Sequence, residues 1–342
     1  MKAKRIKNKM RKLSLLAAAQ RLLAADYIQF VMHTHPDGDT FGSCFGAATL
    51  LEAAGKRCDV VCADVLPERF APFANRPLLS PAAGEDAFEA EKGEKLICAV
   101  DVAAPKQFGE AAGYYVAKTG LLLDHHEYGI PVSDYYIDIK ASAAGEIIYD
   151  LAAALKRLNA INHIPKKALE FIYIAISADT GCFRFSNTSS RTHKTAAKIM
   201  DFGVNCADIE YQLHISKPLK QLEAERIVYN SLQIYLNGAF AAVLIDNASR
   251  QGIPLEYFDT AVDIARSVKG VGVGCTIKQD IAKPGEFRVS MRSDGKADVA
   301  AICTEFGGGG HFAAAGCTLC AASAENALEM ILKAAEKKLK VL

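Results

Sequence analysis

The first half of the chain alternates short apolar runs with stretches of helical period. Predicted strands cover residues 27–32, 57–63, 95–102 and 120–124, and predicted helices cover residues 40–54, 144–158 and 166–178. This alternation is typical of βα units. It predicts an α/β fold in which helices flank a mostly parallel sheet.

A second pattern follows a predicted helix near residues 191–202. Residues 216–236 are rich in helix formers and charges, and Pro218 stands where a helix entry favours proline. Predicted strands at 240–245, 271–277 and 287–291 then surround helices near 255–267 and 297–306. Because 342 residues exceed what one core usually organises, we expect two domains. The predicted parts are a first α/β domain, a connecting helix and a second, smaller α/β domain, at residues 1–215, 216–236 and 237–342.

Composition narrows the class of protein. The chain is 51% hydrophobic and 23% charged, and no apolar window approaches the roughly 20 residues of a membrane span. We therefore expect a soluble, cytoplasmic protein without a membrane segment. The net charge of +1 hides a basic start, since the first 13 residues hold seven Lys or Arg and no acid. Such a run is more often a solvated end than a nucleic-acid contact, which stays the alternative.

The ten cysteines lie in apolar segments and lack the spacing of a disulfide framework. They are therefore expected to be buried thiols in a reducing compartment. Cys317 and Cys320 form a C-x-x-C, but a zinc site needs a second pair and a redox site needs a helix start. We interpret this pair as structural.

The first candidate for chemistry is the segment His33-Thr-His-Pro-Asp37-Gly-Asp39, which lies between a predicted strand and a predicted helix. Open α/β sheets place their ligand sites at such positions. Imidazole and carboxylate groups at this spacing suit a first-row divalent metal better than calcium. An Asp-Gly turn followed by a helix cap is the alternative for this segment taken alone.

Two more strand ends carry ionisable groups. Asp101 closes the strand Ile-Cys-Ala-Val-Asp, and Asp124-His125-His126 closes Leu-Leu-Leu-Asp-His-His. Carboxylates gathered at one edge of a sheet repel one another, whereas divalent cations make the gathering favourable. Asp179 follows a long apolar predicted helix and is a further candidate ligand.

Two further motifs suit an anion. Arg184 offers a planar fork of donors for phosphate, although a surface or packing role competes with this interpretation. Gly307 to Gly310, followed by His311, offers a flexible backbone whose amides could wrap an anion. This tract is neither a dinucleotide fingerprint nor a P-loop, because no Lys followed by Ser or Thr closes it.

Taken together, HTHPDGDTFGS, the Asp of AVDVA, LLLDHH, SADTGCFRFSNTS and FGGGGHFAAAG resemble, in order and spacing, the DHH phosphoesterase family with its DHH-associated C-terminal domain. The match spans most of the chain. Its length resembles the subgroup of bifunctional oligoribonucleases and 3′-phosphoadenosine 5′-phosphate phosphatases. His35 and Thr40 depart from the family's pattern, because a polar residue and a small residue are common there. Neither departure removes a ligand.

The resemblance implies a site with two manganese ions. His33, Asp37 and Asp101 would hold one ion, and Asp39, Asp101, His125 and Asp179 the other, so that Asp101 bridges the pair. His126 would meet the substrate phosphate and, with Asp101, form the catalytic pair, while Asp124 would orient a histidine. The implied substrate-binding positions are His126, Arg184, Arg292, Ser293, Gly308, Gly309, Gly310 and His311.

The implied function is hydrolysis of short oligoribonucleotides and 3′-phosphoadenosine 5′-phosphate, with two ions activating a water for attack on phosphorus. The implied partners are therefore short single-stranded RNA and small nucleotides. A cyclic- or linear-dinucleotide phosphodiesterase is the alternative within the same class. A non-catalytic nucleotide- or RNA-binding protein and an inorganic pyrophosphatase are further alternatives. The sequence leaves open whether the chain forms a homodimer.

Overall fold

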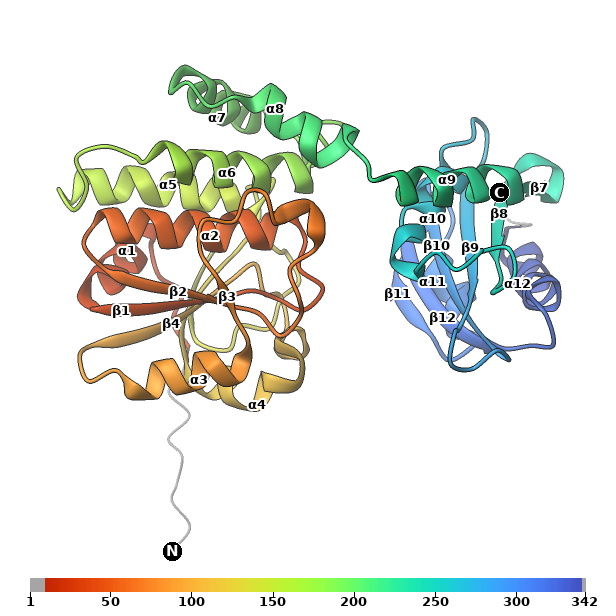
Figure 1. Cartoon of the computed structure of the whole chain (residues 1–342), viewed down its shortest axis with the longest axis horizontal. Helices are drawn as coiled ribbons and strands as arrows, with labels where there is room; N and C mark the ends of the chain where they lie inside the picture. The colour runs from red at the N-terminus through yellow and green to blue at the C-terminus, as the bar shows by residue number, and fades with distance from the viewer. Residues whose placement is uncertain (1–9, 340–342) are drawn as a thin grey trace, which may run out of the picture. The chain divides into compact units, whose positions relative to one another are not determined.

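The computed structural model describes residues 10–339, so most of the basic start lies outside the described residues. The chain forms two compact units, of which the first ends at Ser216 and the second begins at Lys217. Each unit has its own six-stranded sheet covered by helices (Figure 1). Among the described residues, no helix is long and apolar enough to cross a membrane.

The sheet of the first unit is entirely parallel. Its strands are β1 (Tyr27–Val31), β2 (Arg57–Val61), β3 (Leu78–Leu79), β4 (Lys95–Val100), β5 (Thr119–Asp124) and β6 (Asp134–Ile137), in the spatial order β3-β2-β1-β4-β5-β6. The chain proceeds outward from β1 to β3 and then returns to the other side of β1 with β4. The predicted α/β class with a mostly parallel sheet is confirmed.

Helices cover both faces of this sheet (Figure 1). On one side lie α1 (Leu15–Ala24), α2 (Gly38–Ala53), α5 (Ala144–Arg157) and α6 (Lys166–Asp179), with α7 (Ser190–Asp201) and α8 (Cys206–Glu210) packed on α6. On the other side lie α3 (Pro81–Ala90) and α4 (Ala112–Lys118). Short helical turns at Glu68–Phe70, Pro105–Ala111 and Tyr211–Ile215 connect these elements.

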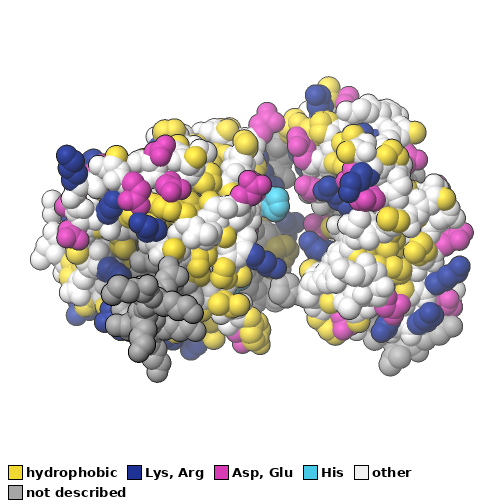
Figure 2. Space-filling view, turned by 90° about the horizontal axis from the view of Figure 1, so that it is seen from below, with side chains coloured by type: hydrophobic (Ala, Val, Ile, Leu, Met, Phe, Trp, Pro, Cys, Tyr) yellow, Lys and Arg dark blue, Asp and Glu magenta, His cyan; other side chains and the backbone are white. Residues whose placement is uncertain are grey.

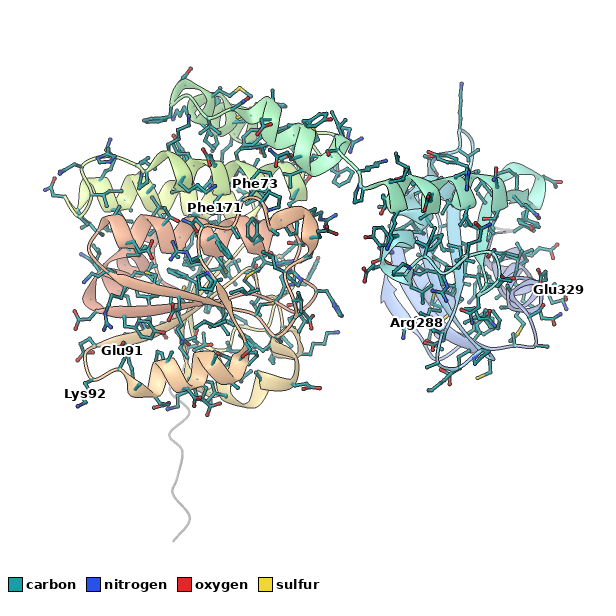
Figure 3. All side chains as sticks on the ribbon, in the orientation of Figure 1. Phe73, Glu91, Lys92, Phe171, Arg288 and Glu329 are labelled. Carbon is teal, nitrogen blue, oxygen red and sulfur yellow. The ribbon has the colours of Figure 1, made fainter. Side chains whose placement is uncertain are left out.

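Helix α2 is almost completely buried, because it lies between the sheet and α6. Phe171 of α6 packs against Phe41 and Phe45 of α2, with ring centroids 5.6 and 5.4 Å apart, and Figure 3 shows Phe171 between the two helices. A Cβ at Gly42 would lie 2.3 Å from the carbonyl oxygen of Phe171, so the backbones approach where Gly42 has no side chain. This packing fixes the start of α2 relative to the end of α6.

The second unit has a mixed sheet. Its strands are β7 (Leu232–Tyr235), β8 (Phe240–Ile245), β9 (Val273–Gln279), β10 (Glu286–Ser293), β11 (Gly309–His311) and β12 (Ala314–Cys320), in the order β11-β12-β10-β9-β8-β7. Only β8 and β9 pair in parallel. A short turn at Leu236–Gly238 joins β7 to β8.

Alternate residues of β8 point into two separate cores, as the two-residue period of a strand requires. Ala241 and Val243 pack with α9 (Leu219–Ser231) and α10 (Ala261–Arg266), while Phe240 and Ala242 pack with α11 (Val299–Thr304) and α12 (Ala324–Leu339). The helix expected at 216–236 is therefore shorter and packs on the second sheet. The helix expected at 255–267 is divided into a turn, Leu255–Phe258, and α10.

The glycine tract differs from the expected flexible loop. Gly309 and Gly310 belong to β11 and pair with Gly316 and Ala315 of β12. A Cβ at Gly308 would lie 2.2 Å from the carbonyl oxygen of Gly316, so the close approach of two backbones requires glycine there. The expectation of a flexible backbone is wrong for the part of the tract that lies in the strand.

The cysteines agree with a structural role. All ten are free thiols. Cys317 is buried and Cys320 is exposed, because residues three apart on β12 lie on opposite faces of the strand. The two thiols of the C-x-x-C therefore do not face one another.

We predict that Gly42→Ala destabilises the protein by about 1–3 kcal/mol, because the added methyl group overlaps backbone atoms of α6. Gly46→Ala is the matched control on the same helix face, since its Cβ would meet Ile172 and Phe171 at an ordinary 3.4 Å. Its free energy of unfolding should stay within about 1 kcal/mol of wild type. Chemical denaturation measures both, and equal losses would contradict the close-packing argument.

Candidate metal centre

Three neighbouring strands bring ionisable side chains to one edge of the first sheet. His33 follows β1, Asp101 follows β4, and Asp124, His125 and His126 end or follow β5. These strands are adjacent, in the order β1-β4-β5. The direction in which the chain adds strands reverses between β1 and β4, which is where open α/β sheets bind their ligands.

The first group of candidate ligands consists of His33, Asp37 and Asp101. His33 Nε2 lies 3.6 Å from Asp37 Oδ1 and 3.5 Å from Asp101 Oδ2. The other ring nitrogen, Nδ1, lies 2.7 Å from the carbonyl oxygen of Thr34. A hydrogen bond from Nδ1 to a carbonyl leaves Nε2 to face a cation, as is usual for metal-binding histidines.

The second group consists of Asp39, His125 and Asp179. His125 Nε2 lies 3.5 Å from Asp39 Oδ2 and 3.8 Å from Asp179 Oδ2. The Nδ1 atom of His125 lies 3.3 Å from the carbonyl oxygen of Ala141, so this ring also presents Nε2 to the acids. In each of these two groups, the ligand atoms lie within 4.8 Å of one another.

Asp101 lies between the two groups. Its Oδ1 is 3.5 Å from His125 Nε2, while its Oδ2 faces His33. The residue is 2% exposed, and its backbone has φ +61°, a conformation that non-glycine residues seldom adopt. Asp101 Oδ1 is buried and accepts no hydrogen bond from the described residues. A buried carboxylate oxygen without a donor, beside two imidazoles, fits a cation-binding site.

The charges of the cluster are strongly coupled. Burial by itself would lower the pKa of His33, but Asp101 and Asp37 raise it to about 11. Burial would also lower the pKa of His125, but Asp101 and Asp39 raise it to about 10. Burial raises the pKa of Asp179 to about 6, although His125 opposes this. The imidazoles therefore hold protons where a bound cation would replace them.

The pKa values of Asp101 and Asp39 are shifted in opposite directions. Burial favours a neutral Asp101, yet His125 and His33 hold its pKa at about 2. Burial and the neighbouring Asp101 raise the pKa of Asp39 well above its usual range. Asp101 is thus the carboxylate around which the positive charge of the site is arranged.

The support of Asp39 is a feature that the sequence did not indicate. Its Oδ2 accepts a hydrogen bond of 2.6 Å from Ala144 N, and its Oδ1 accepts from Gly145 N and Ser43 Oγ at 3.0 and 2.8 Å. The amide donors belong to the first turn of α5, where unpaired N–H groups favour an anion. Only the fold places this helix end beside a residue more than a hundred positions earlier.

Asp37 and Asp179 are also held in place. Asp37 Oδ1 caps α2 by accepting hydrogen bonds from Asp39 N and Thr40 N. The amide of Asn187 donates to the carbonyl oxygen of Asp179 at 3.0 Å and to that of Ser142 at 3.0 Å. The cap that we considered as an alternative to a ligand role is present, and the same residue faces His33.

Gly38 allows α2 to pack against the end of α6. It is the first residue of α2, and a Cβ there would lie 2.3 Å from the Cβ of Ala178. The close approach of the two helices therefore favours glycine at this position.

Asp124 contacts His126. Its Oδ1 lies 2.7 Å from His126 Nδ1 and also accepts a hydrogen bond from His125 N at 2.8 Å. The hydrogen bond to Asp124 raises the pKa of His126. Asp124 is fully buried, whereas the His126 side chain is partly exposed and lies 3.6 Å from Asp101. The carboxylate therefore orients and charges the ring of His126.

The other residues singled out in the first unit have distinct surroundings. Arg184 is exposed, and its Nε donates to the carbonyl oxygen of Gly181 at 2.6 Å. Thr40 is buried, and its hydroxyl connects His33 N to the carbonyl oxygen of Val100. His35 has a side chain that is 94% exposed and lies 3.2 Å from Asp64.

The residues singled out in the second unit lie on β10 and on or just before β11, and β12 separates these two strands. His311 pairs with Ala314 of β12, and Ala314 pairs with Arg292 of β10. The Arg292 guanidinium donates to the carbonyl oxygen of Met291, and Ser293 is buried. The side chain of His311 lies outside what the structure describes. His311 and Arg292 thus lie in one row of this sheet, with Ala314 between them.

Residues 27–176 match the DHH family, N-terminal domain, and residues 239–340 match the DHHA1 domain. The first match includes every candidate ligand except Asp179, and the second includes the mixed sheet from β8 to β12. The chain therefore belongs to the DHH family and carries a DHHA1 domain. It is a hydrolase of the phosphoesterase class, as the motifs predicted.

Curated relatives match the chain over nearly its whole length. The chain is 28% identical over 317 residues to the bifunctional oligoribonuclease and PAP phosphatase NrnA of Thermus thermophilus, covering 91% of this chain and 90% of that protein. It is 26% identical over 304 residues to the protein of the same name from Bacillus subtilis, covering 86% and 90%. These likenesses confirm the resemblance to the subgroup.

A solved structure has the same fold. An exopolyphosphatase-related protein from Bacteroides fragilis superimposes with a TM-score of 0.84 over 94% of this chain and 95% of that chain. Its sequence identity to this chain is 23%, so the likeness concerns the fold. It agrees with the order of elements described for both units.

We predict that cation binding releases protons and strengthens as pH rises. His33 and His125, with pKa values of about 11 and 10, must lose protons to bind a cation, so each proton displaced changes the affinity by up to about tenfold per pH unit. Below about pH 6, protonation of Asp179 should weaken binding further. Calorimetric titration with Mn²⁺ in buffers of different protonation enthalpy counts the protons.

The matched control for this titration is His35→Ala. Its ring is exposed and lies outside both groups of candidate ligands, so the number of released protons should not change. An affinity that is independent of pH would contradict the assignment of protons to the cluster.

Proposed function

We propose that this chain is a two-metal, manganese-dependent phosphoesterase that hydrolyses short oligoribonucleotides and 3′-phosphoadenosine 5′-phosphate. The observation that supports it best is the position of Asp101, whose two carboxylate oxygens face two separate imidazoles. One carboxylate that serves two ligand groups suits a pair of ions better than a single ion.

In this proposal the ligands divide as the resemblance to the family implies. His33, Asp37 and Asp101 would hold one ion, and Asp39, Asp101, His125 and Asp179 the other. Mixed imidazole and carboxylate donors suit a first-row divalent metal, and the choice of Mn²⁺ rests on the resemblance to the family. Bound ions of this kind supply positive charge that activates water and stabilises phosphate oxygens.

The chain's own residues would position the substrate. His126, charged through its hydrogen bond to Asp124, would donate to an oxygen of the scissile phosphate. Arg184 is exposed and would offer further donors. In the second unit, the candidate substrate-binding positions are Arg292, Ser293, Gly308, Gly309, Gly310 and His311.

The substrate class rests on the relatives. Two proteins that match this chain over most of its length are named oligoribonuclease and PAP phosphatase. The ligand groups that such a reaction would use are complete in this chain. A catalytic role therefore explains the buried, unpaired oxygen of Asp101 better than nucleotide binding alone does.

Hydrolysis of a substrate panel tests this proposal. The panel contains a ribo-dinucleotide, a five-nucleotide RNA, 3′-phosphoadenosine 5′-phosphate, a cyclic dinucleotide and pyrophosphate, each with Mn²⁺ or chelator. We expect Mn²⁺-dependent cleavage of the dinucleotide and of 3′-phosphoadenosine 5′-phosphate. Asp101→Ala should reduce kcat/KM on the order of a thousandfold, because it removes the ligand shared by both groups.

Asp86→Ala on α3 is the matched control. Asp86 is exposed on a helix that covers the other face of the sheet, so its loss should leave turnover unchanged. Cleavage of only the cyclic dinucleotide, or of only pyrophosphate, would show that the proposed substrate class is wrong. Binding of nucleotides without any turnover by the metal-loaded protein would refute the enzymatic proposal.

A further inference from the structure

A pocket of about 150 Å³ opens beside the candidate metal centre. Its lining includes two candidate ligands, Asp37 and Asp179, and two basic side chains, Arg69 and His214. Gly38 also lines the pocket, and it packs closely against Ala178, another lining residue. The motifs in the sequence gave no role to Arg69 or His214.

Arg69 is placed by a short helical turn, Glu68–Phe70. Its guanidinium lies over the ring of Phe70, 4.8 Å from the centroid. Phe70 is 2% exposed and stacks on Phe41 of α2 at 5.0 Å between centroids. This contact with the Phe70 ring therefore holds the Arg69 guanidinium near the buried start of α2, where Asp37 and Asp39 lie.

His214 is placed by the turn Tyr211–Ile215, which packs against the turn that carries Arg69. Its Nε2 lies 3.1 Å from Ser177 Oγ and 3.5 Å from Glu210 Oε2. Both contacts use one ring nitrogen, whereas a nucleophilic triad uses two, and Ser177 is fully buried. This arrangement orients the ring and does not activate the serine.

The other nitrogen of His214 is left for a ligand. Among residues 10–339, no hydrogen bond to its Nδ1 is found. Burial lowers the pKa of His214, Glu210 opposes this, and Arg184 and Arg69 lower it further. Arg69 and His214 both line the pocket and come from two turns that pack together, so two donor side chains gather on this side of the site.

The size and chemistry of the pocket suit a phosphate group. At about 30 Å³ per water molecule, the pocket holds roughly five waters, and a phosphate group has a similar number of heavy atoms. A guanidinium presents a planar fork of donors that matches phosphate, and an imidazole N–H adds a directed donor. Asp37 and Asp179 would repel an anion here unless cations neutralise them.

We propose that Arg69 and His214 form a subsite that binds a second, non-scissile phosphate group of the substrate. The subsite rests on the proposed function, because bound cations are what make the pocket acceptable to an anion. It predicts a preference for substrates that carry two phosphate groups, such as a 5′-phosphorylated dinucleotide or a nucleoside bisphosphate. Recognition of the second phosphate then selects the substrate within the first unit itself.

Two dinucleotides that differ only in a 5′-phosphate test the subsite. For wild type, kcat/KM should be at least about tenfold higher for the phosphorylated one, as one charge-assisted contact provides. In Arg69→Ala and in His214→Ala this ratio should fall towards one, mainly through a higher KM for the phosphorylated substrate. Arg69→Lys and His214→Asn, which keep the charge and an N–H donor, should retain part of the preference.

Lys92→Ala is the control for a general change in charge. Lys92 is exposed in the turn between α3 and β4, at the amino end of the strand (Figure 3). Lys92→Ala should leave the ratio of the two kcat/KM values as it is in wild type. The absence of a preference in wild type, or an unchanged ratio in the variants, overturns the subsite. Equal losses for both dinucleotides also overturn it, because they indicate a structural role.

A binding experiment separates this proposal from the proposed function. Wild type and Arg69→Ala are titrated calorimetrically with both dinucleotides in the presence of Ca²⁺. If wild type cleaves neither dinucleotide, the proposed function fails, and the ratio of the two affinities decides the subsite. A phosphate-dependent affinity that disappears in Arg69→Ala supports the subsite, and an affinity without phosphate dependence overturns it.

Discussion

The charge balance of the candidate metal centre depends on the repulsion among carboxylates that meet at one edge of the first sheet. Asp37, Asp39, Asp101 and Asp179 come from three different parts of the chain, and two of them are almost fully buried. Like charges at these distances favour protonation or a bound cation. In the protein alone, protons on His33 and His125 supply part of the balancing charge. The same geometry therefore links metal affinity to pH.

Helix packing holds these acids in place. α2 carries Asp39 near its start and α6 carries Asp179 at its end, and the two helices pack closely at Gly38 and Gly42. The first turn of α5 then directs two amide donors at Asp39. The site is thus rigid because it is built from buried helix ends, which favours a fixed arrangement of ligands.

Charge is distributed differently over the rest of the surface. On the face shown in Figure 2, acidic and basic side chains are interspersed on both units. The basic run at the start of the chain continues into Arg11, which is paired with Asp134 along with Arg21. The face shown in Figure 2 therefore does not form a broad basic surface for an anionic substrate.

The sequence by itself determined the α/β class, most of the strands and helices in the first unit, and the six candidate ligands. Each ligand follows or begins an element with a clear apolar pattern, so local periodicity located the segments that carry the ligands, and the resemblance to the DHH phosphoesterase family implied which residues in them bind metal. The sequence missed β3 and β6, which are very short or only half buried, and it missed β12 and α12 near the end of the chain. Only the tertiary structure decided the rest. The tertiary structure places Gly309 in a strand, the first turn of α5 beside Asp39, and Arg69 in the same pocket as His214. Each of these relations joins residues far apart in sequence. They depend on packing that no local pattern encodes.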